Sequence, residues 1–163
     1  MTPKEYNQCV ELYADRVYRF MLKNTRDATD AEDMVQNAFE VLWRNHEKVE
    51  ADKARAYLFS VSHHQMIDNL RKNKRISYTD TFAEGAAGPA AATNSPDLSP
   101  TLNNALEQLN ETQRSVILLR DYEGYTYDEI AQITELTEAQ VKVYIFRARK
   151  KLQQILVSID RVI

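Results

Sequence analysis

Cysteine, glycine and proline are all scarce in this sequence, and each scarcity excludes something. Its 163 residues include one cysteine, Cys9, which rules out an internal disulfide bond and any metal site built from several cysteines. Three glycines and four prolines leave few helix breakers, as expected of a mainly helical protein. No apolar run approaches the roughly 18 residues of a membrane-spanning helix, and the N-terminus lacks a signal-peptide pattern. We therefore expect a cytoplasmic protein without membrane insertion.

The net charge of −3 argues against nucleic-acid binding only when it is averaged over the chain. Residues 1–50 carry seven basic and ten acidic side chains, and residues 77–141 carry two basic and eleven acidic. By contrast, residues 51–76 carry six basic and two acidic, and residues 142–163 carry six basic and one acidic. Charge acts locally, over a Debye length of roughly 8–10 Å. Two separate basic patches predict two contacts with a polyanion, although solvated helix faces would give the same pattern.

The helix breakers gather in residues 77–100, which hold two of the three glycines, three of the four prolines and no basic residue. This composition predicts a flexible, weakly acidic linker. On both sides of it, apolar residues recur at helical spacing. We expect an all-α fold of two small helical domains, residues 1–76 and 101–163, joined by the linker at 77–100.

Four pairs of residues match the capping box, in which two side chains satisfy backbone N–H groups at the start of a helix. They are Thr29 with Glu32, Asn110 with Gln113, Thr126 with Glu129, and Thr137 with Gln140. Each pair precedes an apolar run of helical period. We therefore predict helices that begin at these four positions, with further helices around 10–21 and 54–70.

The last two capped helices are separated only by residues 134–136, which predicts a helix-turn-helix over residues 126–151. The outward face of its second helix carries four cations and no anion. It consists of Gln140, Lys142, Val143, Phe146, Arg147, Arg149 and Lys150. Such a helix fits the major groove, where Arg and Lys contact guanine edges and phosphates. An ordinary helical hairpin with a basic outer face is the alternative, and the pattern alone leaves it open.

Residues 105–152 resemble region 4 of sigma-70-type sigma factors. ALEQLNETQRSVILLRDYEGYTYDEIA is similar to the segment leading into the family's helix-turn-helix, and VKVYIFRARKKL to its DNA-reading helix. The resemblance implies binding to the −35 promoter element and adds Tyr144 to the expected contacts. Glu135 stands where the family often has a turn glycine, at a cost of roughly 1 kcal/mol for a left-handed residue. Val143 and Tyr144 replace a frequent Ser-Arg pair, so the family's base preference does not carry over.

A second resemblance covers residues 30–45, DAEDMVQNAFEVLWRN, which are similar to the family's region 2 signature. In the family this helix docks on the clamp helices of the largest polymerase subunit. The resemblance implies the same role for Asp30, Glu32, Asp33, Gln36, Phe39 and Glu40. An acidic amphipathic helix suits such docking, because it offers carboxylates to a basic partner. Phe39 and Trp43 are alternatively core residues of their own domain, and for Trp43 we expect that position.

Residues 54–75, ARAYLFSVSHHQMIDNLRKNKR, resemble the family segment that reads and melts the −10 element. The implied DNA contacts are Lys53, Arg55, His63, His64, Arg71, Lys72, Lys74 and Arg75. The loop at about 49–55 is where the family captures an unstacked base, which melting requires. Adjacent histidines on a helix point about 100° apart and no carboxylate cluster completes a set, so we expect no metal and no cofactor. Cys9 is expected to be a small buried residue.

Only regions 2 and 4 are represented, which is typical of the extracytoplasmic-function (ECF) group of sigma factors. Membership implies a protein that directs core polymerase to promoters by binding the −35 element and opening the −10 element. It also implies three partners: core RNA polymerase (clamp helices and flap), promoter DNA and an anti-sigma factor. The sequence shows no nucleophile–base set or phosphate loop, so we do not expect an enzyme. The alternative is a helix-turn-helix regulator that acts without core polymerase and needs no melting segment.

Overall fold

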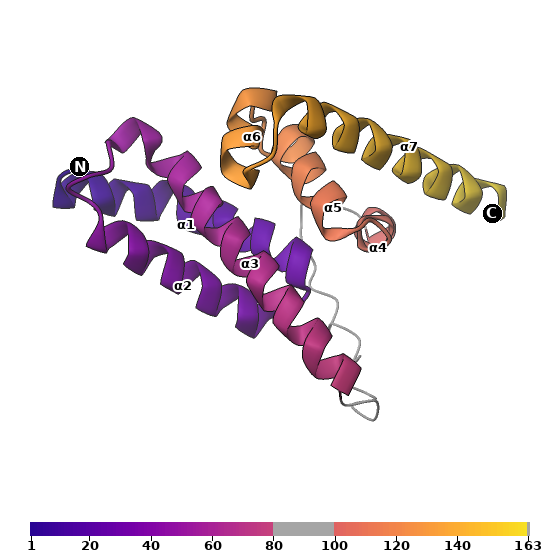
Figure 1. The fold of residues 1–163 in the computed structure, drawn as a ribbon, viewed down its shortest axis with the longest axis horizontal. Coiled ribbons are helices and arrows are strands. Elements are labelled where there is room, and N and C mark those ends of the chain that lie inside the picture. Colours follow the sequence, from indigo (N-terminus) through magenta and orange to yellow (C-terminus); the bar gives the residue numbers. More distant parts are fainter. Residues whose placement is uncertain (80–99, 163) are drawn as a thin grey trace. The chain divides into compact units, whose positions relative to one another are not determined.

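A computed structural model describes residues 1–79 and 100–162 of the chain, and the side chains of residues 1–72 and 100–158. Within these ranges every regular element is a helix, which confirms the all-α fold class. The chain divides into two compact units, Met1–Thr93 and Asn94–Ile163 (Figure 1). Residues 80–99 of the expected linker lie outside the described residues.

Unit 1 is a bundle of three helices, α1 (Pro3–Thr25), α2 (Ala28–Arg44) and α3 (Ala54–Thr79). A short 3₁₀ helix, η1 (Ala51–Lys53), leads into α3. Each of the three helices packs against the other two. Phe20 of α1 meets Phe59 of α3 edge to face, with ring centroids 5.4 Å apart. The largest fully buried core side chains are Val17, Phe20, Met21, Leu42, Leu58, Phe59 and Met66.

The starts of α1 and α2 differ from the sequence analysis. A capping box between Thr2 and Glu5 begins α1, and the sequence analysis missed it. The predicted capping box of Thr29 with Glu32 is wrong. Instead, the side chain of Asp27 accepts hydrogen bonds from the backbone N–H groups of Thr29 and Asp30. An aspartate two residues earlier caps the helix equally well, because its carboxylate also favours the positive end of the helix dipole.

Helix α3 continues to Thr79, three residues into the segment expected to be a linker. No glycine or proline stands between Ala54 and Thr79, and the first one after α1 is Gly85. Local sequence therefore gives the helix no reason to end at residue 76. At the other side of the segment, α4 begins with Pro100, a residue well suited to the first helical turn.

Unit 2 is built around its long last helix, α7 (Glu138–Val162). Against it pack α4 (Pro100–Glu107), α5 (Glu111–Ile117) and α6 (Tyr127–Thr134). Helix α5 runs directly into η2 (Leu118–Tyr122), a π-helical turn in which the Glu123 N–H bonds to the Leu118 carbonyl. The core is apolar and closely covered. Its fully buried members include Val116, Leu119, Ile130, Ile133, Val141, Ile145 and Ala148.

The three capping boxes predicted for unit 2 are confirmed. Asn110 with Gln113 and Thr126 with Glu129 begin α5 and α6. Thr137 accepts a hydrogen bond from the Gln140 N–H at 3.1 Å, and Gln140 Oε1 accepts one from the Thr137 N–H at 2.9 Å. The caps at Thr126 and Thr137 fix where α6 and α7 begin, and they confirm the predicted helix-turn-helix.

The turn between α6 and α7 is left-handed at Glu135, with φ 60° and ψ 31°. The backbone N–H of Glu135 donates to the Ala131 carbonyl, which closes the end of α6. Glu135 therefore holds a positive-φ conformation, which glycine adopts without strain.

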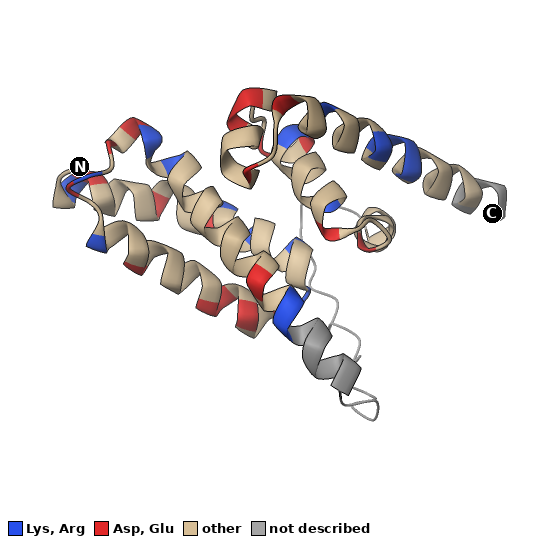
Figure 2. Cartoon of the chain, in the orientation of Figure 1, with Lys and Arg blue, Asp and Glu red and all other residues tan. Residues whose placement is uncertain are grey.

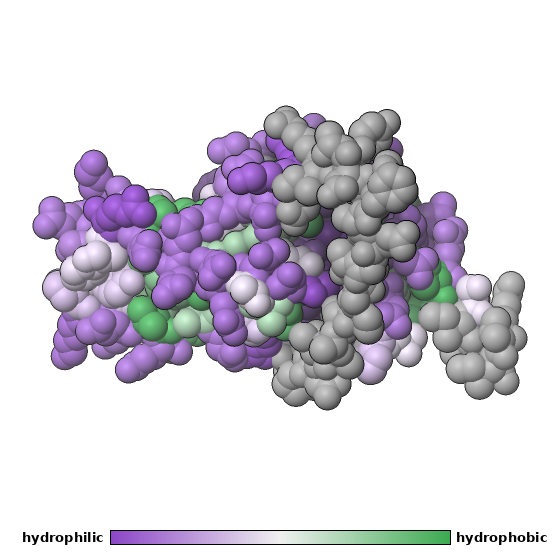
Figure 3. All heavy atoms as spheres, turned by 90° about the horizontal axis from the view of Figure 1, so that it is seen from below, coloured by the Kyte–Doolittle hydropathy of each residue, from purple (hydrophilic) through white to green (hydrophobic). Residues whose placement is uncertain are grey.

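No helix in the described residues is long and apolar enough to cross a membrane. On the face drawn in Figure 3, hydrophilic residues predominate and the hydrophobic patches between them are small. Single exposed apolar residues are normal on protein surfaces, whereas adjacent exposed apolar residues that form a patch need an explanation.

Replacing Glu135 with glycine is expected to stabilise unit 2 by about 1 kcal/mol, because glycine adopts a positive φ without a Cβ clash. The matched control is Gln132→Gly, an exposed position inside the same helix, where glycine should destabilise by a similar amount. Far-UV circular dichroism during denaturant unfolding measures both. Trp43, the only tryptophan, lies in unit 1 and its fluorescence serves as an internal reference. A loss of stability in Glu135→Gly would contradict the strain argument.

Candidate functional site

The outward face of α7 lies where the sequence analysis placed it. Val141, Ile145 and Ala148 point into the core, and the side chains between them are exposed. The exposed set consists of Gln140, Lys142, Val143, Phe146, Arg147, Arg149 and Lys150, with Tyr144 half-buried at its edge. Figure 2 shows the blue segments that these cations form along α7. The helix thus presents one continuous cationic surface opposite its buried side.

Gln140 and Lys142, at the start of this surface, contact other residues of unit 2. The amide oxygen of Gln140 accepts a hydrogen bond from the Thr137 N–H in the capping box. Lys142 lies 3.6 Å from the carboxylate of Glu138 and 5.7 Å from the centroid of the Tyr127 ring. These contacts hold both side chains over the first turn of α7.

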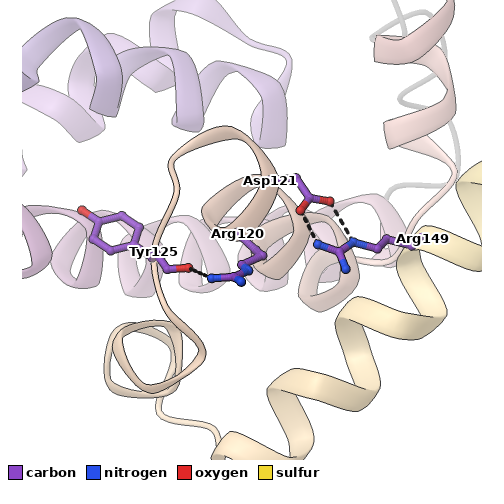
Figure 4. A network of polar contacts seen from close by, with 4 residues as sticks. All are labelled: Arg120, Asp121, Tyr125 and Arg149. Atoms are coloured by element: carbon purple, nitrogen blue, oxygen red, sulfur yellow. Dashed lines mark hydrogen bonds and ion pairs between the residues drawn. The ribbon is translucent and has the colours of Figure 1, made fainter.

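Arg149 forms a bidentate ion pair with Asp121 of η2 (Figure 4). Its Nε donates to Asp121 Oδ2 at 3.0 Å, and a second guanidinium nitrogen donates to Oδ1. These hydrogen bonds raise the pKa of the Arg149 guanidinium. Arg149 is one of the predicted DNA contacts; in the structure its guanidinium joins α7 to η2.

Arg120, also on η2, links this turn to the start of α6. Its guanidinium donates to the Tyr125 carbonyl at 2.9 Å and lies 4.6 Å from the centroid of the Tyr127 ring. The loop between them passes through Gly124 at φ 79°, a conformation that glycine adopts without strain. The sequence analysis missed this bracing, and its only signal was the concentration of polar residues around the single glycine of unit 2.

The outer face of α2 forms a second surface, which is acidic. Glu32, Asp33, Gln36 and Glu40 are exposed along it, and Figure 2 shows the red segments on this helix. Asp30 is half-buried and accepts a hydrogen bond of 3.5 Å from Asn69 of α3. Asp30 therefore joins α2 to α3, whereas the other four side chains are open to a partner.

The two aromatic residues of α2 have exchanged the positions expected for them. Phe39, expected at the docking surface, is only 8% exposed and meets the Tyr6 ring edge to face. Trp43, expected in the core, is 44% exposed, which makes that expectation wrong. Its ring stacks on His46 at a centroid distance of 4.3 Å and meets Tyr6 at 5.0 Å. Trp43 thus lies on the outer face of α2, one turn beyond Glu40.

The basic residues around α3 divide by exposure. Arg71, Lys72 and Lys53 are exposed, and Arg55 is half-buried. His63 is buried in unit 1, and the Nδ1 atom of half-buried His64 lies 2.7 Å from the Ser60 carbonyl. The side chains of Lys74 and Arg75 lie outside those that the structure describes. The cations therefore remain candidates for contacting a backbone, whereas His63 does not reach the surface.

The loop before α3 is tied down at several points. Asn45 donates to the Val41 carbonyl at 2.9 Å and to the Tyr57 hydroxyl at 3.2 Å. The N-terminal ammonium of Met1 donates to the carbonyls of His46 and Val49 at 2.7 and 3.1 Å. Because its backbone is held from both sides, the loop presents η1 and Lys53 in a defined position.

Cys9 is buried as expected, and burial raises the pKa of its thiol, which keeps it protonated. Among the residues that the structure describes, no group of three or more His, Cys, Asp or Glu side chains is placed to hold a metal ion. The candidate binding features are therefore the exposed charged surfaces of α7 and α2 and the exposed cations of α3 and η1.

Comparison with known proteins assigns both halves of the chain. Residues 9–76 match the family Sigma-70 region 2, and residues 101–152 match the family Sigma-70, region 4. ECF RNA polymerase sigma factor SigM of Bacillus subtilis (strain 168) is 27% identical over 153 residues, covering 90% of this chain and 92% of that protein. ECF RNA polymerase sigma factor SigL of Mycobacterium tuberculosis (strain CDC 1551 / Oshkosh) is 30% identical over 149 residues, covering 86% and 82%.

Solved structures agree with this assignment. The sigma factor RpoE of Bartonella quintana, crystallised with the anti-sigma factor NepR, matches with a TM-score of 0.77 at 27% identity. The match covers 94% of this chain and 97% of that one. CnrH, in complex with the cytosolic domain of CnrY, shares the fold with a TM-score of 0.67 at 23% identity, covering 94% of this chain and 88% of that one. The chain therefore belongs to the ECF sigma factors of RNA polymerase.

Proposed function

We propose that α7 binds the −35 promoter element as duplex DNA, with the exposed face of its first half in the major groove. The observation that carries this proposal is that α7 exposes basic side chains and has no acidic ones over most of its length. Lys142, Arg147 and Lys150 are exposed, and no acidic residue occurs between Ala139 and Ser158. A major groove about 12 Å wide admits one helix, and the phosphates on both sides attract such a surface.

The bracing of α7 supports the same role, because a helix that contacts base edges has to be held in a fixed direction. Asp121 and Arg149 tie the middle of α7 to η2, and the capping box of Thr137 fixes its first turn. We assign Arg149 to positioning and Arg147, which is exposed on the open face, to direct contact with DNA. Rigid support of this kind lets a few side chains discriminate between bases.

For the −10 element, we propose that Arg71, Lys72, Lys53 and Arg55 follow the DNA backbone along α3 and its preceding loop. This segment carries six basic and two acidic residues over 51–76, the other cationic part of the chain. The fixed loop at 45–53 is a suitable place for capturing an unstacked base, since melting needs a preformed surface. The buried His63 is not part of this surface, and His64 is left at its edge.

We propose that the outer face of α2 docks on core polymerase. Its members are Glu32, Asp33, Gln36, Glu40 and, from the structure, Trp43. Carboxylates attract a basic partner and set the approach, whereas a half-exposed tryptophan supplies apolar area that is lost from water on binding. Phe39 supports this face from beneath, and Asp30 holds α2 against α3.

An anti-sigma factor is proposed as a further partner. The Bartonella quintana relative that matches this fold was crystallised with one, NepR, at 27% identity and a TM-score of 0.77. Such a partner would compete with core polymerase or promoter DNA by covering the surfaces described above.

Run-off transcription with purified core polymerase on candidate promoters tests the whole proposal. The full chain should convert core polymerase into a form that initiates at defined positions. A chain that grips duplex DNA but neither binds core polymerase nor supports initiation would favour the alternative, a helix-turn-helix regulator that acts alone.

Arg147→Ala is expected to weaken binding of the holoenzyme to −35 duplex about tenfold, because a base or phosphate contact is lost. Binding to core polymerase should stay unchanged, since Arg147 lies on the open face of unit 2. Fluorescence anisotropy with labelled promoter DNA measures the first quantity, and titration of core polymerase the second. Lys4→Ala, which removes an exposed cation from α1, is the control. Equal losses in both assays would indicate a folding defect and contradict the assignment.

Glu40→Lys is expected to weaken core polymerase binding about tenfold, because it reverses a charge on the acidic face beside Trp43. Glu11→Lys reverses an equally exposed glutamate on α1 and should have little effect. Competition against wild-type chain for core polymerase provides the measurement, with circular dichroism to verify folding. Identical affinities for the two variants would remove α2 from the proposed interface.

A further inference from the structure

The exposed face of α7 has an apolar centre. Successive residues of a helix point about 100° apart, so the position opposite the buried Val141, Ile145 and Ala148 can be found from spacing alone. That position is occupied by Ala139, Val143 and Phe146 in the first half of the helix. Lys142 and Arg147 flank this line on its two sides, and Lys150 continues it.

Two residues of this apolar centre, Val143 and Phe146, are unusually exposed to solvent. Val143 is 45% exposed and Phe146 is 67% exposed, although each carries a large hydrophobic side chain. The two are three residues apart, so they are neighbours on the surface of the helix and form one patch. Contact between these two side chains and water costs free energy, and unit 2 leaves both of them exposed. The patch therefore fits an apolar group that a partner brings.

The surrounding charge identifies the partner as nucleic acid. Cations flank the patch on both sides, and no carboxylate of α7 follows Glu138 until Asp160. In the major groove of B-DNA, the apolar group within reach of a helix is the 5-methyl group of thymine, which alanine and phenylalanine side chains contact. The N-terminal part of the second helix is the part that reaches base edges in helix-turn-helix proteins.

We propose that Ala139, Val143 and Phe146 read thymine methyl groups, so that this chain selects −35 elements with thymine opposite the N-terminal part of α7. This inference rests on the proposed binding of −35 duplex and adds a specificity to it. Cations on the flanks hold the phosphates, whereas the apolar line discriminates thymine from cytosine. The residue at 143 determines this preference most directly, because a polar residue there would replace apolar contact with hydrogen bonding.

The test uses the full chain in holoenzyme and a duplex whose upstream segment is randomised and whose downstream segment is a pre-melted bubble. Sequences retained by the holoenzyme are prepared again with deoxyuridine in place of thymidine in the upstream segment only. Uracil pairs identically but lacks the 5-methyl group. We expect the retained sequences to be enriched in thymine, and affinity to fall about fourfold for each contacted methyl group that is removed.

Two matched variants locate the effect. Val143→Ser should lose most of the difference in affinity between the thymine and uracil duplexes, because only Ala139 and Phe146 then remain to contact methyl groups. Val157→Ser should keep the wild-type preference, because Val157 is 43% exposed on the same side of α7 but about 21 Å further along the helix. Phe146→Ala should reduce the preference without abolishing retention, which provides a second variant if Val143→Ser fails to fold.

The outcomes separate this inference from the proposed function. If the wild-type holoenzyme retains duplex but does not distinguish thymine from uracil, the methyl reading is wrong and the −35 proposal stands. If the wild-type holoenzyme selects no upstream sequence from the randomised pool, the −35 proposal itself fails. If Val143→Ser instead weakens binding to core polymerase, the patch is a protein-binding surface and the inference is overturned.

Discussion

The register of α7 depends on the turn at Glu135, and everything that unit 2 offers to a partner depends on that register. Each residue added to a helix rotates the following side chains by about 100°, so a start one residue earlier or later would bring cations into the core. The left-handed Glu135 and the capping box of Thr137 fix the start. Val141, Ile145 and Ala148, which are fully buried, fix the same register from inside. The local turn and cap and the packing of the buried residues therefore favour the same register, which keeps the basic face of α7 outward.

The ion pair of Asp121 and Arg149 restricts the orientation of α7 more than it stabilises unit 2. Both side chains are nearly half exposed, with relative accessibilities of 45% and 48%, so solvent screens the attraction and the free-energy gain is small. Its bidentate geometry, however, restricts how α7 can rotate against η2. The π-helical turn contributes to this geometry, because its wider turn changes the direction of the side chains that follow α5. Unit 2 thus combines a packed apolar core, which supplies stability, with polar links that set the orientation of one helix.

Sequence patterns predicted the elements of the fold well and the individual surfaces less well. Capping boxes depend on residues three apart, so those of α5, α6 and α7 were recognisable without a structure. Trp43 and Phe39 were misplaced because both lie on one edge of the apolar stripe of α2. The centre of that stripe is occupied by Ala31 and Ala38, which are fully buried, and small residues weigh little in a hydrophobic pattern. The covering of Phe39 by Tyr6 and the pairing of Arg149 with Asp121 join residues 33 and 28 positions apart. Contacts of that separation follow from tertiary packing, which local sequence does not encode.

The α2 and α7 surfaces share one plan with opposite signs of charge. Each has apolar or aromatic side chains, Trp43 on α2 and Val143 with Phe146 on α7, set among exposed charged residues. Interfaces between macromolecules commonly have this anatomy, with an apolar centre and a polar rim. The rim acts at a distance and selects a class of partner, because an acidic rim repels DNA and a basic rim attracts it. The apolar centre acts only in contact, so it discriminates between members of that class. If α2 binds core polymerase and α7 binds promoter DNA as proposed, each surface needs both steps, because the protein has to reject most other proteins and most DNA sequences.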